Sequence, residues 1–382
     1  MYGAIVIEGH VQGLSNVRSL GEMGIPVYVL DVVNCLARYS KYCTKFFHCP
    51  PFESEEFILF LMDLAKRENL NGWLLVPSND HIVENLSLHK SELNSLYKMM
   101  IPEKDALYKI IDKRNLLEIA ESCGVSVPKT CYCYDIEKAH DFRYPLLVKG
   151  RHGLSFYKHL HTKVLSVDSF NTLCKVVDSM DESIKKDVMI QEMIPEDKIR
   201  GVVSFTCFAL QGKIMSYWMG KKLREHPIKF GTATISQSVF DARVLDKVIP
   251  LIKVLDYSGV CEVEFMFDLR DNDYKLIEIN PRTWLWVGLA KACGVDYTKM
   301  IYQHVNNIHV DFPTKYEVGT KWRNALTDFY YGMKAIAKKQ ISWKEYHLSL
   351  KGKTIHAVWD SHDVLPGLIF PLLLPMIAKK RR

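Results

Sequence analysis

The 382-residue chain lacks the features that would place it in a membrane or outside the cell. No apolar run approaches the roughly 20 residues that a membrane-spanning helix needs. The 10 cysteines include no Cys-x-x-Cys pair, and the closest spacing is that of Cys131 and Cys133. This spacing favours neither a metal array nor a disulfide framework. Because no N-terminal signal peptide is recognisable, we expect reduced, mostly buried thiols and a cytoplasmic protein.

Positive charge is scarce outside the C-terminus. The net charge is +6, and residues 379–382 supply four of these charges, so only about +2 is left for the rest of the chain. Binding of nucleic acid needs a broad basic face, so we expect no nucleic-acid partner. The composition, 48% hydrophobic and 25% charged, is that of a globular protein. The length predicts two or three domains of about 150 residues each.

The first turn between strand and helix lacks the Gly-x-Gly-x-x-Gly pattern of dinucleotide-binding proteins, since only Gly9 and Gly13 stand in it. An NAD(P)-dependent oxidoreductase is therefore a minor alternative, and a structural turn or a carboxylate-binding helix N-terminus stays open. Strands and helices nevertheless alternate. We expect strands at 3–8, 27–30 and 73–76, and helices from about Ser15 as the N-cap, at 53–67 and at 80–96. This alternation predicts a doubly wound parallel α/β domain over residues 1–104.

A region of mixed α+β character is expected next. Apolar spacing predicts one helix over residues 105–123, which Gly124 ends. The expected strands that follow lie at 145–149, 163–167, 187–192 and within 202–218.

Two further strands carry the most informative residues. The segments 261–268 and 275–282 are joined by the turn-forming run 270–273. Side chains alternate across a strand, so an antiparallel pairing brings together Glu264, Glu278 and Asn280.

Two carboxylates and an amide oxygen are the hard ligands that Mg²⁺ prefers. Arg282 stands beside them as a clamp for an anion, and Glu262, on the same face as Glu264, has no assigned role. The alternative is a solvated strand face that Asn280-Pro281 merely ends.

Basic residues upstream are candidates for binding phosphate. Lys149 ends an apolar strand just before the loop 150–155, whose glycines and backbone N–H groups could cover phosphates. Lys113 is a second candidate, and Lys222 and Arg224 form a third basic stretch before residues 229–234. Each has a structural alternative: a snorkelling lysine, an exposed helix residue and a solvated loop.

One strand end offers a place for an adenine ring. Gln191, Glu192, Met193 and Ile194 close an apolar strand before Pro195. Such a segment can present backbone groups to the edge of the base while apolar side chains pack on its face. A plain linker between domains is the alternative.

In chain order, these segments resemble the ATP-grasp superfamily over roughly residues 105–300. The resemblance implies a two-lobed module, with a small lobe at about 125–192, a large lobe at about 193–300, and ATP between them. It makes Lys113 and Lys149 the phosphate lysines. The adenine-binding hinge would be residues 191–194, and the metal ligands would be Glu264, Glu278 and Asn280.

Further segments are similar to the carboxylate–amine ligase branch, which includes D-aspartate ligase-like and polysaccharide-cluster enzymes. They are residues 38–41, 77–80 and 222–232.

The resemblance implies that ATP phosphorylates a carboxylate and that an amine attacks the acyl phosphate, which gives an amide, ADP and phosphate. The cofactors would be ATP and Mg²⁺, with Mn²⁺ as the alternative ion. Lys222, Arg224 and Arg282 would be the catalytic residues. The partners would be a small-molecule carboxylate and an amine, such as an amino acid or a sugar acid, and a second copy in a homodimer. A catalytically silent ATP-binding scaffold is the alternative.

Residues 301–382 form a C-terminal extension that ends in an unusual tail. The apolar run 368–377 precedes four basic residues, and its prolines oppose a regular helix. Two placements stay open for 368–382. The tail docks in a groove of the protein, or it makes a peripheral contact with anionic lipid at the inner face of the membrane.

Overall fold

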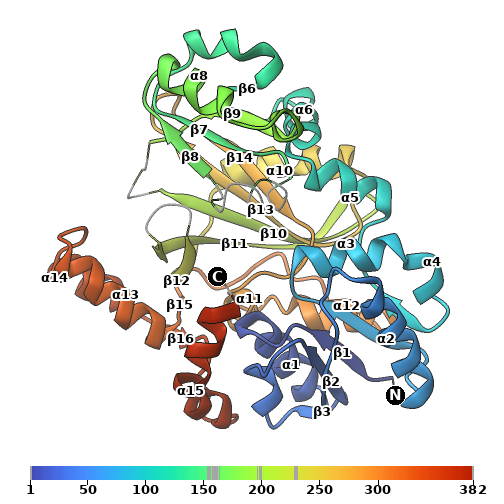
Figure 1. Cartoon of the computed structure of the whole chain (residues 1–382). Coiled ribbons are helices and arrows are strands. Elements are labelled where there is room, and N and C mark those ends of the chain that lie inside the picture. The colour runs from blue at the N-terminus through green and yellow to red at the C-terminus, as the bar shows by residue number, and fades with distance from the viewer. Residues whose placement is uncertain are drawn as a thin grey trace.

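The computed structural model describes residues 2–380, apart from 153–155, 157–161, 163, 196, 198–199 and 228–230, and no side chains at 377–380. Figure 1 shows three parts of the structure: a blue α/β domain, a green lobe at the opposite end, and a long sheet between them. The red C-terminal helix lies beside the blue domain, and the orange helices before it extend to the left from the end of the long sheet.

The first domain is built on a parallel sheet in the order β3-β2-β1-β4-β5. Its strands are β1 (Ala4–Ile7), β2 (Val27–Asp31), β3 (Cys43–His48), β4 (Trp73–Pro77) and β5 (Tyr97–Met99). Its helices are α1 (Val11–Glu22), η1 (Ala37–Tyr39), α2 (Glu55–Arg67), α3 (Asp80–Leu88) and α4 (Lys90–Leu93). Because β1 pairs with β2 on one side and β4 on the other, the predicted doubly wound domain is confirmed.

The start of α1 differs from the prediction. The helix begins at Val11, so Ser15 lies inside it and donates its hydroxyl to the carbonyl of Val11 at 3.2 Å. The expected N-cap was wrong because the chain turns much closer to β1. A Cβ at Gly13 would stand 2.1 Å from the carbonyl oxygen of Glu8, so only glycine allows this approach. Gly13 therefore serves close packing at the first turn.

The expected single helix 105–123 is two helices. They are α5 (Lys104–Ile111) and α6 (Lys113–Ser122), and Asp112 between them has an extended backbone with φ −79° and ψ 105°. The Asp112 carboxylate caps α6 by accepting the backbone N–H of Arg114. An aspartate in mid-pattern competes with helix continuation in this way, which apolar spacing does not reveal. The expected helix 80–96 likewise ends early, at Leu88.

The green lobe is an antiparallel sheet in the order β6-β9-β7-β8. Its elements are β6 (Thr130–Tyr132), η2 (Cys133–Asp141), β7 (Leu146–Gly150), β8 (Val164–Val167), α8 (Phe170–Asp178), α9 (Glu182–Lys185) and β9 (Val188–Glu192). Apolar side chains of the sheet and of α8 form one buried cluster.

The long sheet has the order β14-β13-β10-β11-β12-β15-β16. Its main elements are β10 (Val202–Leu210), β11 (Lys213–His226), β12 (Thr232–Ser238), α10 (Ala242–Val254), β13 (Gly259–Asp268), β14 (Asp273–Asn280), α11 (Val287–Ala292) and α12 (Tyr297–Val305). The extension adds β15 (Lys321–Arg323), α13 (Ala325–Ala337), α14 (Trp343–Leu350), β16 (Thr354–His356) and α15 (Leu365–Lys380). The boundaries expected at 104 and 300 stay predictions.

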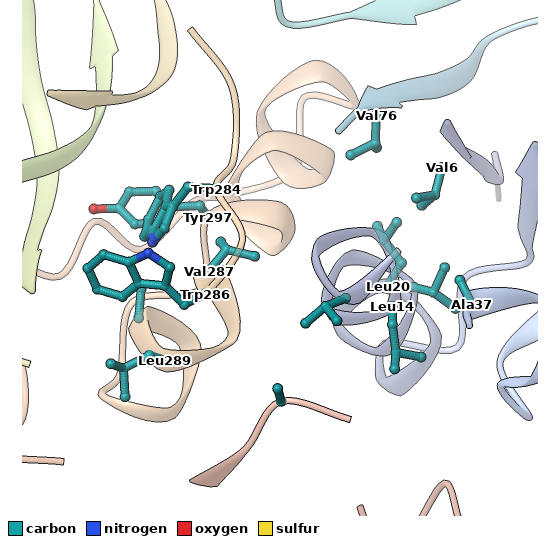
Figure 2. Close-up of a cluster of buried hydrophobic side chains, with 14 of the residues drawn as sticks. Val6, Leu14, Leu20, Ala37, Val76, Trp284, Trp286, Val287, Leu289 and Tyr297 are labelled. Atoms are coloured by element: carbon teal, nitrogen blue, oxygen red, sulfur yellow. The ribbon is translucent and has the colours of Figure 1, made fainter. Parts of the chain in front are cut away.

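A core of aromatic rings joins the long sheet to the first domain. Trp284, Trp286 and Tyr297 gather beside α11, across from the leucines of α1, as Figure 2 shows. Trp218 of β11 stacks on Trp284 with ring centroids 6.0 Å apart. Buried aromatic side chains carry large apolar areas, so this cluster ties the two parts firmly together.

The C-terminal tail is helical, contrary to the expectation from its prolines. Pro371 and Pro375 both lie within α15. A proline inside a helix costs about 3 kcal/mol. Phe370 and Leu373 are buried in the core shared with the first domain, and each full burial returns about 1.5–3 kcal/mol. The two burials together return about 3–6 kcal/mol, so packing offsets much of the cost of the two prolines, and this part of the tail docks on the protein.

Candidate functional site

The hairpin of β13 and β14 has the register that a shared polar face requires. Glu264 lies directly opposite Glu278, and Glu262 lies opposite Asn280. A bulge between Glu264 and Phe265 leaves Ile277 out of the pairing. Without this bulge, Ile277 would face Glu264. Bulges commonly re-aim side chains near functional sites, and this one brings the two carboxylates together.

Lysines from three other elements surround this pair. Lys222 of β11 donates from Nζ to both oxygens of Glu264, at 3.0 and 3.2 Å. Lys113, at the start of α6, has its Nζ 3.8 Å from Oε2 of Glu278. Lys149, near the end of β7, is a third cation whose charge lowers the pKa of Glu278. The structure thus gathers the predicted cations around the predicted carboxylates.

The electrostatics of the group follow from this crowding. Burial opposes ionisation of Glu278, but the charges of Lys113, Lys222, Lys149 and Arg282 hold its pKa below the ordinary value. Burial also opposes the charge on Lys222, yet Glu264 and Glu262 raise the pKa of that lysine. Burial and the charge of Lys113 lower the pKa of Lys149 to about 7. The site is a network of mutually stabilised charges.

Arg282 is held by the first domain. Its guanidinium forms an ion pair with Asp80, with Nε 2.8 Å from Oδ1, and donates from Nη1 to the carbonyl of Thr283 at 2.9 Å. Asp80 begins α3, at the carboxyl end of β4. Burial opposes the charge on Arg282, but Asp80 raises its pKa above the ordinary value. The expected anion clamp therefore has a protein carboxylate as its partner in this structure.

Glu262, for which the sequence predicts no role, belongs to the same group. Its Oε2 accepts a hydrogen bond from Nδ2 of Asn280 at 3.1 Å. The side chain is buried, and the Ser204 side chain is a further hydrogen-bonding neighbour. Burial and the charge of Glu264 raise the pKa of Glu262 to about 8. The sequence placed Glu262 on the same strand face as Glu264, which could have indicated that it belongs to the site. Its contact with Asn280 follows from the register of the hairpin.

The predicted adenine hinge lies at the end of β9. Gln191 accepts a hydrogen bond from Lys149 Nζ at 2.7 Å, which links the predicted hinge to the predicted phosphate lysine. The carboxylate of Glu192 is bound by Arg143. The backbone N–H groups of Glu192 and Met193 donate to other carbonyls of the lobe. Adenine binding by residues 191–194 stays a prediction, with Ile194 buried beside it.

Arg224 points to the C-terminal extension. Its Nη1 donates to Asp328 of α13 at 2.7 Å, and its guanidinium carbon lies 4.4 Å from the centroid of the Tyr346 ring. Ser349 accepts a further hydrogen bond from it. The anion site expected at Arg224 stays a prediction, although these contacts are those of a structural residue.

Parts of two predicted loops lie outside the described residues, namely 153–155 of the phosphate loop and 228–230 before Gly231. What is described of the first loop includes Arg151, whose Nη2 donates to Asp112 at 2.6 Å. This bond ties the loop to the helix start that carries Lys113.

The predicted metal ligands suit Mg²⁺ in chemistry. Within the described residues, no group of three His, Cys, Asp or Glu side chains converges as a metal site. The predicted set is different, since it has two facing carboxylates and the amide oxygen of Asn280. All are hard oxygen donors, and Mg²⁺ commonly takes few protein ligands and completes its shell with phosphate oxygens and water. These residues would hold such an ion beside bound phosphates.

Comparison with known proteins identifies the architecture. Residues 222–307 match the family described as "Carbamoyl-phosphate synthase L chain, ATP binding domain". The D-aspartate ligase of Enterococcus faecium is 21% identical over 262 residues, which are 64% of this chain and 62% of that protein. The chain thus spans less than two thirds of the length of this relative.

Solved structures extend the likeness to most of the chain. Biotin carboxylase from Campylobacter jejuni superimposes with a TM-score of 0.66 at 16% identity, over 84% of this chain and 74% of that one. N5-carboxyaminoimidazole synthetase from Staphylococcus aureus, complexed with ADP, gives 0.64 at 18% identity, over 89% and 87%. The L-amino acid ligase of Bacillus licheniformis gives 0.59 at 14% identity, over 80% and 74%. The predicted resemblance to the ATP-grasp superfamily is confirmed, and the chain has the ATP-grasp fold.

Proposed function

We propose that the protein is an ATP-dependent ligase that joins a carboxylate to an amine. The observation that carries this proposal is the facing pair Glu264 and Glu278 on the bulged hairpin, enclosed by Lys113, Lys149 and Lys222. Such a group can neutralise a triphosphate and its metal ion. The fold supports ATP as the substrate, and the names of the D-aspartate and L-amino acid ligases support the formation of an amide.

The reaction would have two steps. An oxygen of the substrate carboxylate attacks the γ-phosphorus of ATP, and ADP leaves with the electrons of the broken bond. The amine nitrogen then attacks the acyl carbon, phosphate leaves, and the nitrogen loses a proton to give the amide. Phosphoryl transfer depends chiefly on positioning and charge neutralisation, which these residues can supply.

Each residue has a proposed task. Lys113 and Lys149 would bind the phosphates, while Gln191 would orient Lys149 through their hydrogen bond. Arg282 would leave Asp80 to bind the transferred phosphoryl group, because a guanidinium binds a phosphate as readily as a carboxylate. Lys222 would move from Glu264 to the same phosphoryl group. Glu264, Glu278 and Asn280 would hold Mg²⁺, or Mn²⁺ in its place, which supplies charge neutralisation when bound.

Residues 38–41 lie where the first domain meets the extension. The Ser40 hydroxyl and the Lys41 backbone N–H both donate to the Asp363 carboxylate, each at 2.8 Å. Arg18 pairs with the same carboxylate at 2.9 Å. This segment therefore serves packing between domains, and it adds no contact to the proposed site among the described residues.

A screen for ADP release tests the proposal. Full-length protein would be incubated with ATP, Mg²⁺ and pairs of carboxylates and amines, beginning with amino acids and sugar acids. We expect ADP release that requires both partners, together with an amide product of the matching mass. Product formation separates a ligase from an ATPase.

Two variants test whether activity in this screen depends on the proposed site. Glu278→Ala removes one carboxylate of the facing pair, and we expect a loss of about 100- to 1000-fold in turnover with an unchanged circular dichroism spectrum. Glu182→Ala is the matched control, because that side chain is 85% exposed and distant in sequence from the hairpin. Near-normal turnover by a folded Glu278→Ala protein would exclude the assigned site. Binding of ATP without turnover across the screen would instead favour the silent scaffold.

The tail supports a second proposal, which concerns location. None of the described helices is long and apolar enough to cross a membrane. On α15, however, Leu368 and Leu372 are 59% and 75% exposed, although Phe370 is buried. The basic C-terminal residues follow in sequence. We propose that this exposed side rests on anionic lipid.

Liposome co-sedimentation tests the membrane contact. We expect the full chain to bind vesicles that contain phosphatidylserine, and the variant Leu368→Asp/Leu372→Asp to lose most of that binding. Both side chains are exposed, so the fold should survive. Equal binding by the two proteins would exclude the contact. The predicted homodimer stays a prediction.

A further inference from the structure

The side-chain amide of Asn280 has a defined orientation. Its Nδ2 donates to Oε2 of Glu262 at 3.1 Å, and its Oδ1 accepts from Nη2 of Arg282 at 3.3 Å. The amide therefore lies between a carboxylate on β13 and a guanidinium just beyond β14. Both neighbours are supplied by the hairpin and the residues that follow it.

The chemistry of the two neighbours enforces this orientation. A guanidinium can only donate hydrogen bonds, and the Oε2 atom of Glu262 accepts one from the amide nitrogen. If the amide of Asn280 were rotated by 180°, its oxygen would face Glu262 and its NH₂ group would face Arg282. The NH₂ group would then face the N–H donors of Arg282, which is repulsive, and Oε2 of Glu262 would lose its donor. Glu262 and Arg282 thus select the same one of the two orientations.

The orientation matters because only the oxygen of an amide is a ligand for hard cations. We propose that Glu262 is a positioning residue, which keeps the oxygen of Asn280 available to the bound metal ion by holding the amide nitrogen. This inference rests on the proposed function, since it assumes a metal ion at Glu264, Glu278 and Asn280. Partners of ligating side chains commonly tune metal sites in this way.

The surroundings of Glu262 fit a positioning role. Glu262 is directly opposite Asn280 in the register, so the contact is part of the hairpin itself. Asn280 uses only Oε2, and the Ser204 side chain is a further hydrogen-bonding neighbour of the carboxyl group. Arg282 is expected to turn towards phosphate during the reaction, and Glu262 then becomes the group that still holds the amide.

Binding of Mn²⁺ to the full-length protein in the presence of ADP tests the proposal without turnover. Electron paramagnetic resonance of free Mn²⁺ gives the affinity. We expect Glu262→Ala to weaken binding about 10- to 100-fold. Glu262→Gln should stay within about threefold of the wild type, because its amide oxygen can still accept from Asn280. Equal losses in these two variants, or no loss in Glu262→Ala, would overturn the proposal.

A double-mutant cycle shows whether Glu262 acts through Asn280. In an Asn280→Ala background, Glu262→Ala should weaken Mn²⁺ binding by less than about twofold, since there is no amide left to position. A full additive loss would instead mean that Glu262 binds the metal directly or supports the sheet, and it would exclude the positioning role.

If Glu262→Ala does not fold, a second pair of variants, which exchanges the carboxylate and the amide between positions 262 and 280, tests the same proposal. Asn280→Asp places two carboxylates against each other, and we expect weaker Mn²⁺ binding despite the added charge. Combining it with Glu262→Gln restores a donor and should recover most of the affinity. Failure of this recovery would overturn the proposal. Absence of Mn²⁺ binding by the wild-type protein with ADP would refute the proposed function itself, whereas normal binding with insensitive variants would refute only the role of Glu262.

Discussion

Two basic residues of β11 stand two positions apart and have similar partners, yet their surroundings differ. Lys222 pairs with Glu264 of β13, and Arg224 pairs with Asp328 of α13. Both pairs are largely buried, with side-chain exposures of 18% and 12% for the first and 10% and 0% for the second. From sequence, both residues belonged to one predicted anion site.

The pair at Arg224 is closed by hydrogen bonds. Asp328 also accepts from Thr234 at 3.0 Å and from Arg323 at 2.9 Å, so both of its oxygens have donors. The guanidinium of Arg224 has Ser349 and the Tyr346 ring as further partners. A buried charge that is satisfied on every side supports structure, because moving it would leave its partners unpaired.

The ion pair of Lys222 and Glu264 lies among other charged side chains. Glu264 faces Glu278 across the hairpin, and Glu262 adds a third carboxylate on the same face. Lysines from the small-lobe sheet and from α6 offset this charge. Under the proposed function, a metal ion would replace Lys222 at Glu264. The difference teaches that an ion pair becomes a functional group when its partners can be exchanged for a ligand.

Asp328→Ala gives the largest expected effect on this comparison. Removing one partner of a buried ion pair leaves uncompensated charge on Arg224 and Arg323, and we expect the free energy of unfolding to fall by about 3 kcal/mol. Urea denaturation monitored by circular dichroism measures it. Glu182→Ala is again the control and should change little. If Asp328→Ala is as stable as the wild type but loses ATP turnover, the Arg224 pair belongs to the active site.

Lys149 provides the next test, through pH. Burial and the charge of Lys113 lower its pKa to about 7, so the lysine carries its charge mainly below pH 7. Phosphate binding needs that charge, so the affinity for ADP should fall by up to about tenfold for each pH unit above 7. Isothermal calorimetry from pH 6 to 9 measures this dependence, and Lys149→Met should bind weakly with little dependence on pH.

Protein stability should change in the opposite sense. In the unfolded chain Lys149 keeps its proton up to its ordinary pKa, so the unfolded state binds more protons between pH 7 and about 10. The contribution of this residue to stability therefore rises with pH over that range. A fall in ADP affinity that merely follows loss of folding would contradict the assignment.

Lys222→Met gives the smallest effect and compares the two pairs directly. Without the ammonium group, Glu264 is left for a cation, so Mg²⁺ should raise the melting temperature of this variant by about 2 °C more than that of the wild type. Arg224→Met is the matched control, and Mg²⁺ should bring it no extra gain because Asp328 keeps Arg323 and Thr234. An equal gain in both variants would remove the distinction between the pairs.

The fold and the main part of the site could be predicted from local patterns. Alternating apolar residues marked β13 and β14, and their polar positions carried carboxylate and amide ligands on one face. Lys149 stood at the end of an apolar strand, which is where the structure has it. These features depend on periodicity within a few residues, and the strand conformation follows from them directly.

Errors arose where local and distant interactions compete. The helix expected at 105–123 breaks because the Asp112 carboxylate binds both the N–H of Arg114 and the side chain of Arg151. The helix α15 forms despite its prolines because apolar side chains of the tail pack against the first domain. Arg151 is 39 residues from Asp112, and the first domain is farther still from the tail, so a local pattern does not show these two contacts.

The sequence by itself determined the alternation of strands and helices, the ATP-grasp motifs and the set of charged residues, because each depends on residue type and short spacing. Only the tertiary structure decided which charged and polar residues are partners. The bulge placed Glu278 opposite Glu264, the register gave Asn280 to Glu262, and packing of the extension gave Arg224 to Asp328. The physical reason is that a charge takes its role from the partners around it, and folding brings those partners together from distant parts of the chain.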